Sequence, residues 1–224
     1  MTFVTRKIVV PALALVALVS GAGTAHAAAV DYVGFAWETG TLAPSNPGDV
    51  LAAAAVVTQI DPLFEVDLGG VEGTLFIDGL VSTGGYVDGL GRTVIGYVGG
   101  GISVYADPAH NADWGVNPAN GTVPGTFVDG DLVFSGNFTS FTLILDPSGG
   151  GVFEGYVDGT GGSALAGPCS GCAYTFSGTF AAPTGAQIPA GYDLQIDGVL
   201  DVESTVSVES MSWGAVKNLY NPGR

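Results

Sequence analysis

The two cysteines of the chain lie close together, in the stretch GPCSGCAYTF at residues 167–176. This spacing suits a disulfide, a redox centre or half of a metal site. A redox pair normally begins a helix, whose N-terminus lowers the thiol pKa, but the residues after Cys172 alternate as a strand does. If the protein is exported, as argued below, the two thiols are expected to pair. We predict a disulfide between Cys169 and Cys172 that closes a tight turn, with redox and metal roles as the alternatives.

Side chains for nucleophilic catalysis are scarce. Beyond residue 27, His110 is the only histidine and Lys217 the only lysine, and no G-x-S-x-G serine elbow occurs. A glycosidase needs two carboxyl groups on opposite sides of a cleft, and the sequence does not pair any two of its 21 acids. We therefore predict no catalytic residues and a protein that is not an enzyme. A carboxylate-pair hydrolase is the enzymatic alternative.

Oxygen ligands for calcium are abundant, above all in the long irregular segment at residues 106–130. Four of its side chains stand at short spacings and are our candidate ligands: Asp107, Asn111, Asp113 and Asn117. Side chains of these types also bond to their own backbone in successive turns. A calcium site and a series of plain turns therefore remain alternative interpretations, and no other cofactor is expected.

Three aromatic residues lie in or before the same segment. Trp114, Tyr105 and Tyr97 are candidates for stacking on a sugar ring, as exposed aromatics do in lectin-like proteins. They are equally suited to a hydrophobic core. Exposure of these side chains would favour carbohydrate binding, and burial would favour a structural role.

The first 27 residues have the features of an export signal. A positive start at residues 6–7 precedes an apolar run over residues 8–19, and the AHA triplet at 25–27 matches a signal-peptidase site. The apolar run is short for a membrane span, and an uncleaved N-terminal anchor is the alternative. We predict cleavage near Ala27, an extracellular or cell-surface location, and no transmembrane segment in the mature chain.

The chain is strongly acidic, with 21 Asp and Glu against 5 Lys and Arg and a formal net charge of −16. Nucleic acids and anionic membranes are bound through Lys and Arg, so this balance excludes both as partners. The acidity is consistent with solubility through self-repulsion and with binding of divalent cations. An extracellular polysaccharide or a cell-surface component is the partner class that we retain.

Period-two alternation of apolar and polar residues is the main structural signal after the export signal. Each alternating segment is short, rich in β-branched and aromatic residues, and bounded by Gly, Asn, Asp or Pro, as strands with one buried face are. The predicted strands are 30–38, 63–68, 73–80, 93–98, 101–105, 131–138, 140–145, 151–157, 173–180 and 192–202. Residues 51–60 (LAAAAVVTQI) suit either a helical turn or a strand, and we favour the strand.

Asp-Gly pairs punctuate these strands at five places. Because Asp-Gly suits tight hairpin turns, they indicate a meander of antiparallel hairpins, with bulges as the alternative at one or two of them. The pairs begin at Asp78, Asp88, Asp129, Asp158 and Asp197. The last residues, 206–224, differ in pattern and suit a tail or a short helix.

Several phrases of the sequence resemble a known group of proteins. GTLFIDGL, DWGVNPANGTVPGTFVDGDLVFSGNF, CAYTFSGTF and IPAGYDLQIDGVLDV are similar to segments of uncharacterised secreted β-rich bacterial proteins, which in turn resemble PEP-CTERM-type exported proteins. The chain lacks the Pro-Glu-Pro motif, the C-terminal apolar span and the closing basic cluster of the sorting tail. The resemblance implies an exported, β-rich protein and carries over no catalytic residue.

These observations predict an all-β fold. We expect a single domain over residues 28–205, built as an antiparallel β-sandwich or partly closed barrel of about ten strands. For function, we expect a non-enzymatic secreted or cell-surface structural or matrix protein. A carbohydrate-binding module, with or without calcium, is the alternative.

Overall fold

The structure is a computed structural model that describes residues 28–40, 42–115, 125–167, 170–181 and 191–203. Its strands are β1 (Ala28–Glu38), β2 (Val50–Ile60), β3 (Glu72–Val87), β4 (Thr93–Val98), β5 (Gly101–Asp107), β6 (Asp131–Leu145), β7 (Gly150–Gly161), β8 (Ala173–Ala181) and β9 (Leu194–Glu203). The helical elements are short: η1 (Pro62–Phe64), η2 (Gly125–Phe127) and α1 (Ser163–Ala166). The predicted all-β, antiparallel fold is confirmed, and residues 51–60 form a strand.

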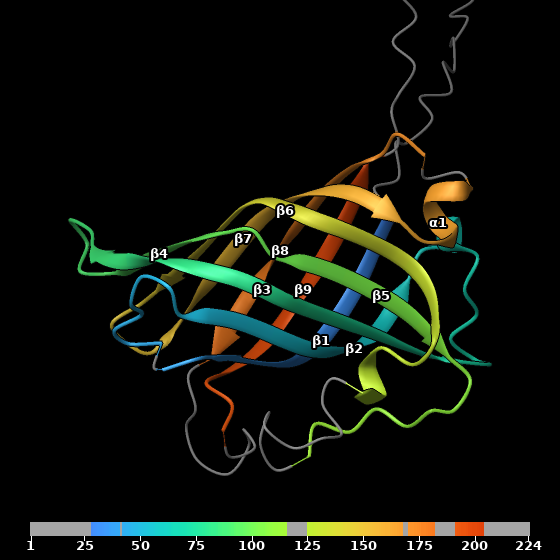
Figure 1. Cartoon of the computed structure of the whole chain (residues 1–224), viewed down its shortest axis with the longest axis horizontal. Coiled ribbons are helices and arrows are strands. Elements are labelled where there is room, and N and C mark those ends of the chain that lie inside the picture. Colours follow the sequence, from blue (N-terminus) through green and yellow to red (C-terminus); the bar gives the residue numbers. More distant parts are fainter. Residues whose placement is uncertain (1–27, 41, 116–124, 168–169, 182–190, 204–224) are drawn as a thin grey trace, which may run out of the picture.

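The strands form a closed barrel (Figure 1). Each strand pairs antiparallel with its neighbour around the ring, and the last strand, β9, returns to pair with β1, from Ala28 opposite Val202 to Ala36 opposite Leu194. Strands β4 and β5 share one position, because both lie between β3 and β6. The nine strands of the described residues therefore fill eight positions, close to the predicted number of about ten. Of the two predicted architectures, the structure shows a barrel, which is closed, and not a sandwich.

Inward-facing side chains fill the barrel, as the alternating pattern requires. Aromatic rings dominate: Tyr32 stacks on Phe176 with ring centroids 4.9 Å apart, and Phe153 stacks on Phe176 at 5.2 Å. Glycines make room for these rings. A Cβ atom at Gly198, which lies opposite Tyr32 on β9, would stand 2.5 Å from the Tyr32 hydroxyl.

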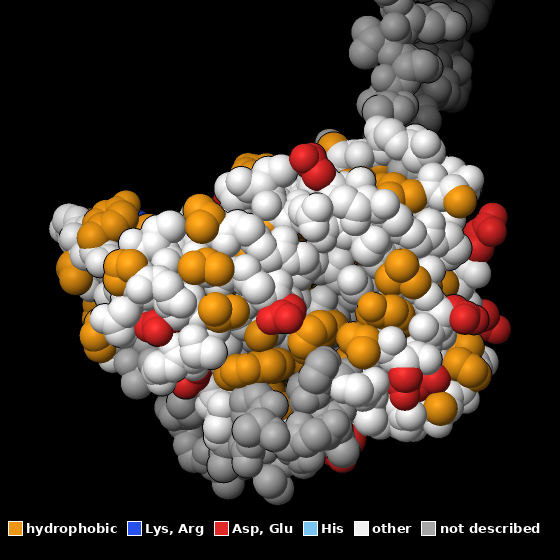
Figure 2. Space-filling view, viewed as in Figure 1, with side chains coloured by type: hydrophobic (Ala, Val, Ile, Leu, Met, Phe, Trp, Pro, Cys, Tyr) orange, Lys and Arg blue, Asp and Glu red, His pale blue; other side chains and the backbone are white. Residues whose placement is uncertain are grey.

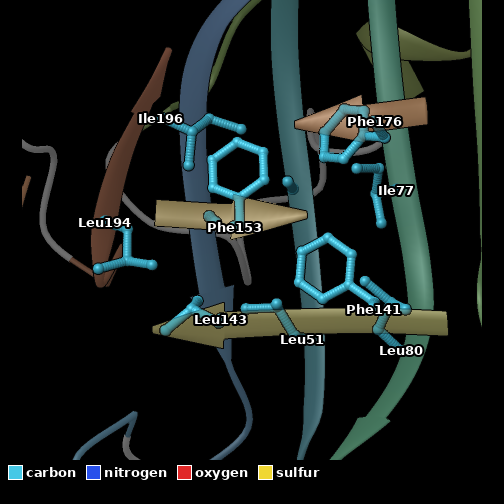
Figure 3. Close-up of a pocket in the computed structure, with 11 residues that line it drawn as sticks. Leu51, Ile77, Leu80, Phe141, Leu143, Phe153, Phe176, Leu194 and Ile196 are labelled. Atoms are coloured by element: carbon cyan, nitrogen blue, oxygen red, sulfur yellow. The ribbon is translucent and has the colours of Figure 1, made fainter. Parts of the chain in front are cut away.

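The interior retains one small apolar cavity, of about 20 Å³ (Figure 3). Its lining is entirely apolar, with the rings of Phe141, Phe153 and Phe176 turned toward the aliphatic side chains of the opposite strands. A space of this size holds about one water molecule. The barrel is thus packed around this cavity, which is too small for a larger ligand.

The segment after β5 packs on the outside of the barrel. Phe127 is fully buried there against Ala54 of β2, and the Trp114 indole packs against Phe127, with Trp37 and Phe76 beside them. Because strand β2 is covered on both faces, it reads as an almost continuous apolar run. This explains why the alternation at residues 51–60 is weak.

Only one of the five Asp-Gly pairs makes a tight hairpin turn. Asp88-Gly89 joins β3 to β4, with Asp88 N–H donating to the Arg92 carbonyl. The pairs at Asp78, Asp158 and Asp197 lie inside strands, and the pair at Asp129 precedes β6. The predicted Asp-Gly meander was therefore wrong in most of its turns, although the strands themselves do form a meander.

Strand β3 continues past the barrel. Strand β2 pairs with it only as far as Val81, whereas β4 follows it to Val87. We call the projecting hairpin, residues 83–93, the arm; it extends at the left of Figure 1. We call this end of the barrel the arm end. None of the helices within the described residues has the length and apolar character needed to cross a membrane.

Candidate functional site

The arm end of the barrel holds a buried polar cluster. It is centred on Glu38, the last residue of β1, whose carboxylate is almost wholly removed from solvent. Ser45 Oγ donates to Glu38 Oε1 at 2.5 Å, and Tyr97 Oη donates to Oε2 at 3.1 Å. The Glu38 backbone N–H donates to Asp193 Oδ2 at 2.7 Å. The cluster joins the end of β1 and the loop after it to Tyr97 and Asp193, which lie far away in the sequence.

The hydrogen bonds of this cluster run in one direction when Glu38 is ionised. The Gly84 N–H donates to Ser82 Oγ at 3.0 Å, and Ser82 Oγ lies 2.7 Å from Ser45 Oγ. Because the Ser45 hydroxyl proton is used on Glu38, the proton between the two serines must come from Ser82. The chain Gly84 to Ser82 to Ser45 to Glu38 then leaves no donor unused.

Burial sets the electrostatics of the cluster. Desolvation raises the pKa of Glu38, and the hydrogen bonds from Ser45 and Tyr97 oppose that rise only in part. The pKa of Asp193 is also raised by desolvation, against the opposing effect of the Glu38 N–H. Desolvation and the nearby Glu38 charge raise the pKa of Tyr97 far above its usual range, so that Tyr97 remains a proton donor.

A groove runs along the outside of the same end. It lies between the β1–β2 loop, at residues 43–47, and the arm. Its two sections have volumes of about 710 and 330 Å³, and Ser45 and Tyr86 line both. Asn46, Thr83 and Thr142 also line the larger section. Ser45 therefore belongs both to the buried cluster and to the wall of the groove.

The arm exposes apolar side chains. Tyr86, Val87 and Leu90 have exposed fractions of 64%, 68% and 74%, and Figure 2 shows hydrophobic side chains gathered on the projecting end. The arm's only charged residues form a pair, in which Arg92 contacts Asp88 through Nη2 at 2.7 Å and Nε at 2.8 Å. Hydrogen bonds from Arg92, led by its backbone N–H, lower the pKa of Asp88.

The aromatic residues predicted to stack on sugars do not form a common surface. Tyr97 is buried in the polar cluster. Trp114 is half-buried, with its indole N–H donating to the Ala54 carbonyl at 2.9 Å and its ring against Phe35. Tyr105 lies half-buried on β5. The burial of Tyr97 and the partial burial of Trp114 favour a structural role for both side chains.

The predicted calcium ligands that the structure describes bond to backbone groups or, for Asn111, to the side chain of Asp129. Asp107 Oδ1 accepts the Ala109 N–H, Asp113 Oδ1 accepts the Gly115 N–H, and Asn111 Nδ2 donates to Asp129 Oδ2. Asp107 is buried and its Oδ2 has no hydrogen-bond partner. In the described part of the chain, no three His, Cys, Asp or Glu side chains gather around a metal position. Asn117 lies outside the described residues, and calcium binding stays a prediction.

Several other predictions fall outside the described residues. Cys172 is half-buried, packs against the core and forms no disulfide with any described residue. Its expected partner Cys169 is not among them, so the predicted disulfide is untested. The export signal at 1–27 and the tail at 206–224 also lie outside the described residues.

Comparison with known proteins gives no relative. No family model, no curated protein and no solved structure matches the chain. The resemblance to secreted bacterial proteins therefore stays an expectation. The function is inferred below from the geometry of the arm end alone.

Sequence reasoning missed most of this site. Glu38 and Asp193 are 155 residues apart, and nothing local links them. The one local signal was the loop around Ser45, which is rich in Pro and Asn. The arm was not predicted either, because the expected strand ended at residue 80, whereas β3 continues to Val87.

Proposed function

We propose that this protein is a non-enzymatic structural or matrix protein of the cell exterior, and that its arm is the surface by which it is retained there. The exposure of Tyr86, Val87 and Leu90 on one projecting hairpin carries the proposal. Large apolar side chains grouped on a surface mark contact sites with other molecules. The filled barrel provides a rigid support for that hairpin.

The buried cluster also supports a structural reading. Ser45 belongs to the loop that closes the arm end, and its bond to Glu38 fastens that loop to β1. Ser82 of β3 also holds this loop through two backbone hydrogen bonds. The Ser82 carbonyl accepts the Gly48 N–H at 2.9 Å, and the Ser82 N–H donates to the Asp49 carbonyl at 2.7 Å. A carboxylate in a catalytic pair must reach substrate, whereas Glu38 is enclosed.

Fractionation of producing cells tests this proposal. The tagged full-length protein is expected in the envelope or extracellular matrix fraction. Replacing Tyr86, Val87 and Leu90 together by Ser should move it into the culture medium. Leu132→Ser, on β6 and 39% exposed, is the matched control and should be retained as wild type is. Wild-type protein found only in the cytoplasm, or retention unchanged by the arm substitutions, would refute the proposal.

Carbohydrate binding is the second candidate, and the groove is the observation that favours it. An exposed tyrosine ring, the amide of Asn46 and the hydroxyls of Thr83 and Thr142 line one open channel, which is the mixture of stacking and hydrogen-bonding groups that sugars need. Tyr86→Ala should then abolish retention on a polysaccharide column. Tyr156→Ala, at a 51% exposed tyrosine of β7, should not. Equal retention of both variants would exclude the groove as the sugar site.

A further inference from the structure

The end of β3 is an open strand edge. Gly85, Tyr86 and Val87 pair with Ile95, Val94 and Thr93 of β4, as the last three pairs of that ladder. On the other side, the β2 ladder ends at Val81, and Ser82 makes the last two backbone bonds toward the β1–β2 loop. Among the described residues no strand lies beside residues 85–87 on that side. An extended strand with one unpaired edge is a template for another strand.

The groove leaves room for such a strand. The loop at 43–47 stands beside the start of the arm, where the Pro47 ring approaches Gly84. Further out, the space between loop and arm remains open, and Tyr86 and Val87 are mostly exposed. An added strand lies about 4.8 Å from its neighbour, so it would occupy the space that the groove provides.

The charge of the arm indicates what kind of strand would bind at the open edge of β3. Arg92 is the only Lys or Arg between residues 28 and 203, and it is paired with Asp88. The arm is therefore neutral within a chain whose formal net charge is −16. Two copies of the chain repel each other least where their arms meet. A neutral, apolar strand suits this edge, and the arm is itself such a strand.

The geometry of self-pairing is also complementary. If two copies pair antiparallel about a two-fold axis at Tyr86, each segment 84–88 supplies the partner that the other lacks. Val87 of one copy then lies opposite Gly85 of the other. The turn that follows Val87 carries the exposed Leu90 beyond the paired residues, on the side of the other copy.

We propose that two copies of this chain join through the open edge of β3, arm against arm, to form one continuous sheet across the contact. This deepens the proposed function, on which it rests, by naming the partner at the arm as a second copy. A two-fold contact uses the same edge of both copies, so we expect it to form a closed dimer.

Sedimentation of the purified full-length protein over a concentration series tests the pairing. Wild type should form dimers. Tyr86→Lys and Tyr86→Asp should each weaken self-association by at least about tenfold, because like charges then face each other across the two-fold axis. An equimolar mixture of the two variants should regain dimers, because opposite charges meet. Tyr156→Lys is the matched control at an exposed tyrosine away from the arm and should dimerise as wild type does.

Three outcomes would overturn the pairing: a wild-type monomer at all concentrations, a wild-type dimer that the two Tyr86 substitutions leave intact, or a monomer that purifies with a foreign peptide in the groove. The mixture of the two Tyr86 variants distinguishes a lost contact from misfolding, because two variants that fail to fold could not form a dimer together. The outcome also separates the two proposals. A monomer whose envelope retention still depends on the arm would leave the structural proposal standing and remove only the self-pairing.

Discussion

Glu38 shows how a buried carboxylate can link separate segments of a fold. Its carboxylate accepts hydrogen bonds from Ser45 and Tyr97, which recover part of the hydration that burial removes. Each bond ties a different segment to the end of β1. Burial still outweighs these bonds in its effect on protonation, because the pKa of Glu38 is raised.

The raised pKa predicts a pH dependence of stability. A carboxyl group whose pKa is higher in the folded protein stabilises the fold at pH values below its unfolded pKa, and this contribution is lost as the pH rises through the folded pKa. The free energy of unfolding should therefore fall above the ordinary Glu pKa of 4.5. Glu38→Gln should flatten that fall in urea unfolding measured between pH 4 and 8.

Asp88→Asn provides the control of opposite sign. The pKa of Asp88 is lowered, so its contribution is present above its unfolded pKa and is lost as the pH falls. Removing Asp88 should change the acid side of the profile and leave the slope assigned to Glu38 in place. A Glu38→Gln profile that is parallel to wild type across the whole range would contradict the assignment.

Tyr97→Phe isolates one bond of the cluster. The ring keeps its edge-to-face contact with Phe141, at 5.6 Å between centroids, while Glu38 loses a donor. We expect a loss of about 1.5–3 kcal/mol in the free energy of unfolding, as for a hydrogen bond to a charged group. Tyr156→Phe removes an exposed hydroxyl that bonds to Glu154 and should have almost no effect in the same denaturant titration. Equal losses in the two variants would show that the cluster adds nothing.

At the scale of elements, paired glycines let aromatic rings lie across the barrel. Gly178 of β8 and Gly198 of β9 are directly opposite each other, and Tyr32 of β1 lies opposite Gly198 on the other side. The Tyr32 hydroxyl reaches over this pair to the Ser177 carbonyl at 3.3 Å. Any side chain at Gly198 would meet both of those groups.

Gly198→Ala should therefore destabilise the barrel. Its Cβ would collide with the Ser177 carbonyl and the Tyr32 hydroxyl, and overpacking of this kind costs about 1–3 kcal/mol. Thermal unfolding would show the loss as a lower Tm. Gly89→Ala is the control, since no atom lies within 4 Å of a Cβ built there. If the Gly198→Ala variant were as stable as wild type, β8 and β9 would have to move apart from Tyr32 at little cost.

The positions of the strands in the sequence could be predicted better than the way in which the strands pair around the barrel. Alternation located most strands, because each has one face in the core. Closure could not be predicted, since the pairing of Val30 with Leu200 depends on contacts that leave no mark in either segment. The Asp-Gly rule misled for Asp158, which lies inside β7 and does not end it. The cluster around Glu38 could not be predicted, because Tyr97 and Asp193 lie far from Glu38 in the sequence.

At the scale of the whole molecule, acidity and self-association oppose each other. The chain carries 21 acidic residues, whereas the arm is neutral. Repulsion between two such molecules acts over a distance that salt shortens, from about 30 Å at 0.01 M to about 8 Å at 0.15 M. The apolar contacts between the arms are almost unaffected by salt in this range.

Dimerisation should therefore strengthen as salt is added. The dissociation constant of the wild-type dimer is expected to fall between 10 and 150 mM NaCl, and sedimentation equilibrium at both concentrations measures it. A dimer that weakens with salt would indicate attraction between opposite charges. That outcome would place the contact away from the neutral arm.

The closed ring also constrains how the chain can reach its final form. The ring closes where β1 pairs with β9, the last described strand. The paired residues of these two strands are more than 150 residues apart in the sequence. Contacts this distant form late and slowly, because a long loop must be closed first. If the protein is exported as proposed, a chain threaded N-terminus first emerges with β1 unable to find its partner, β9. Such a chain would remain unfolded during passage and would close only on the far side.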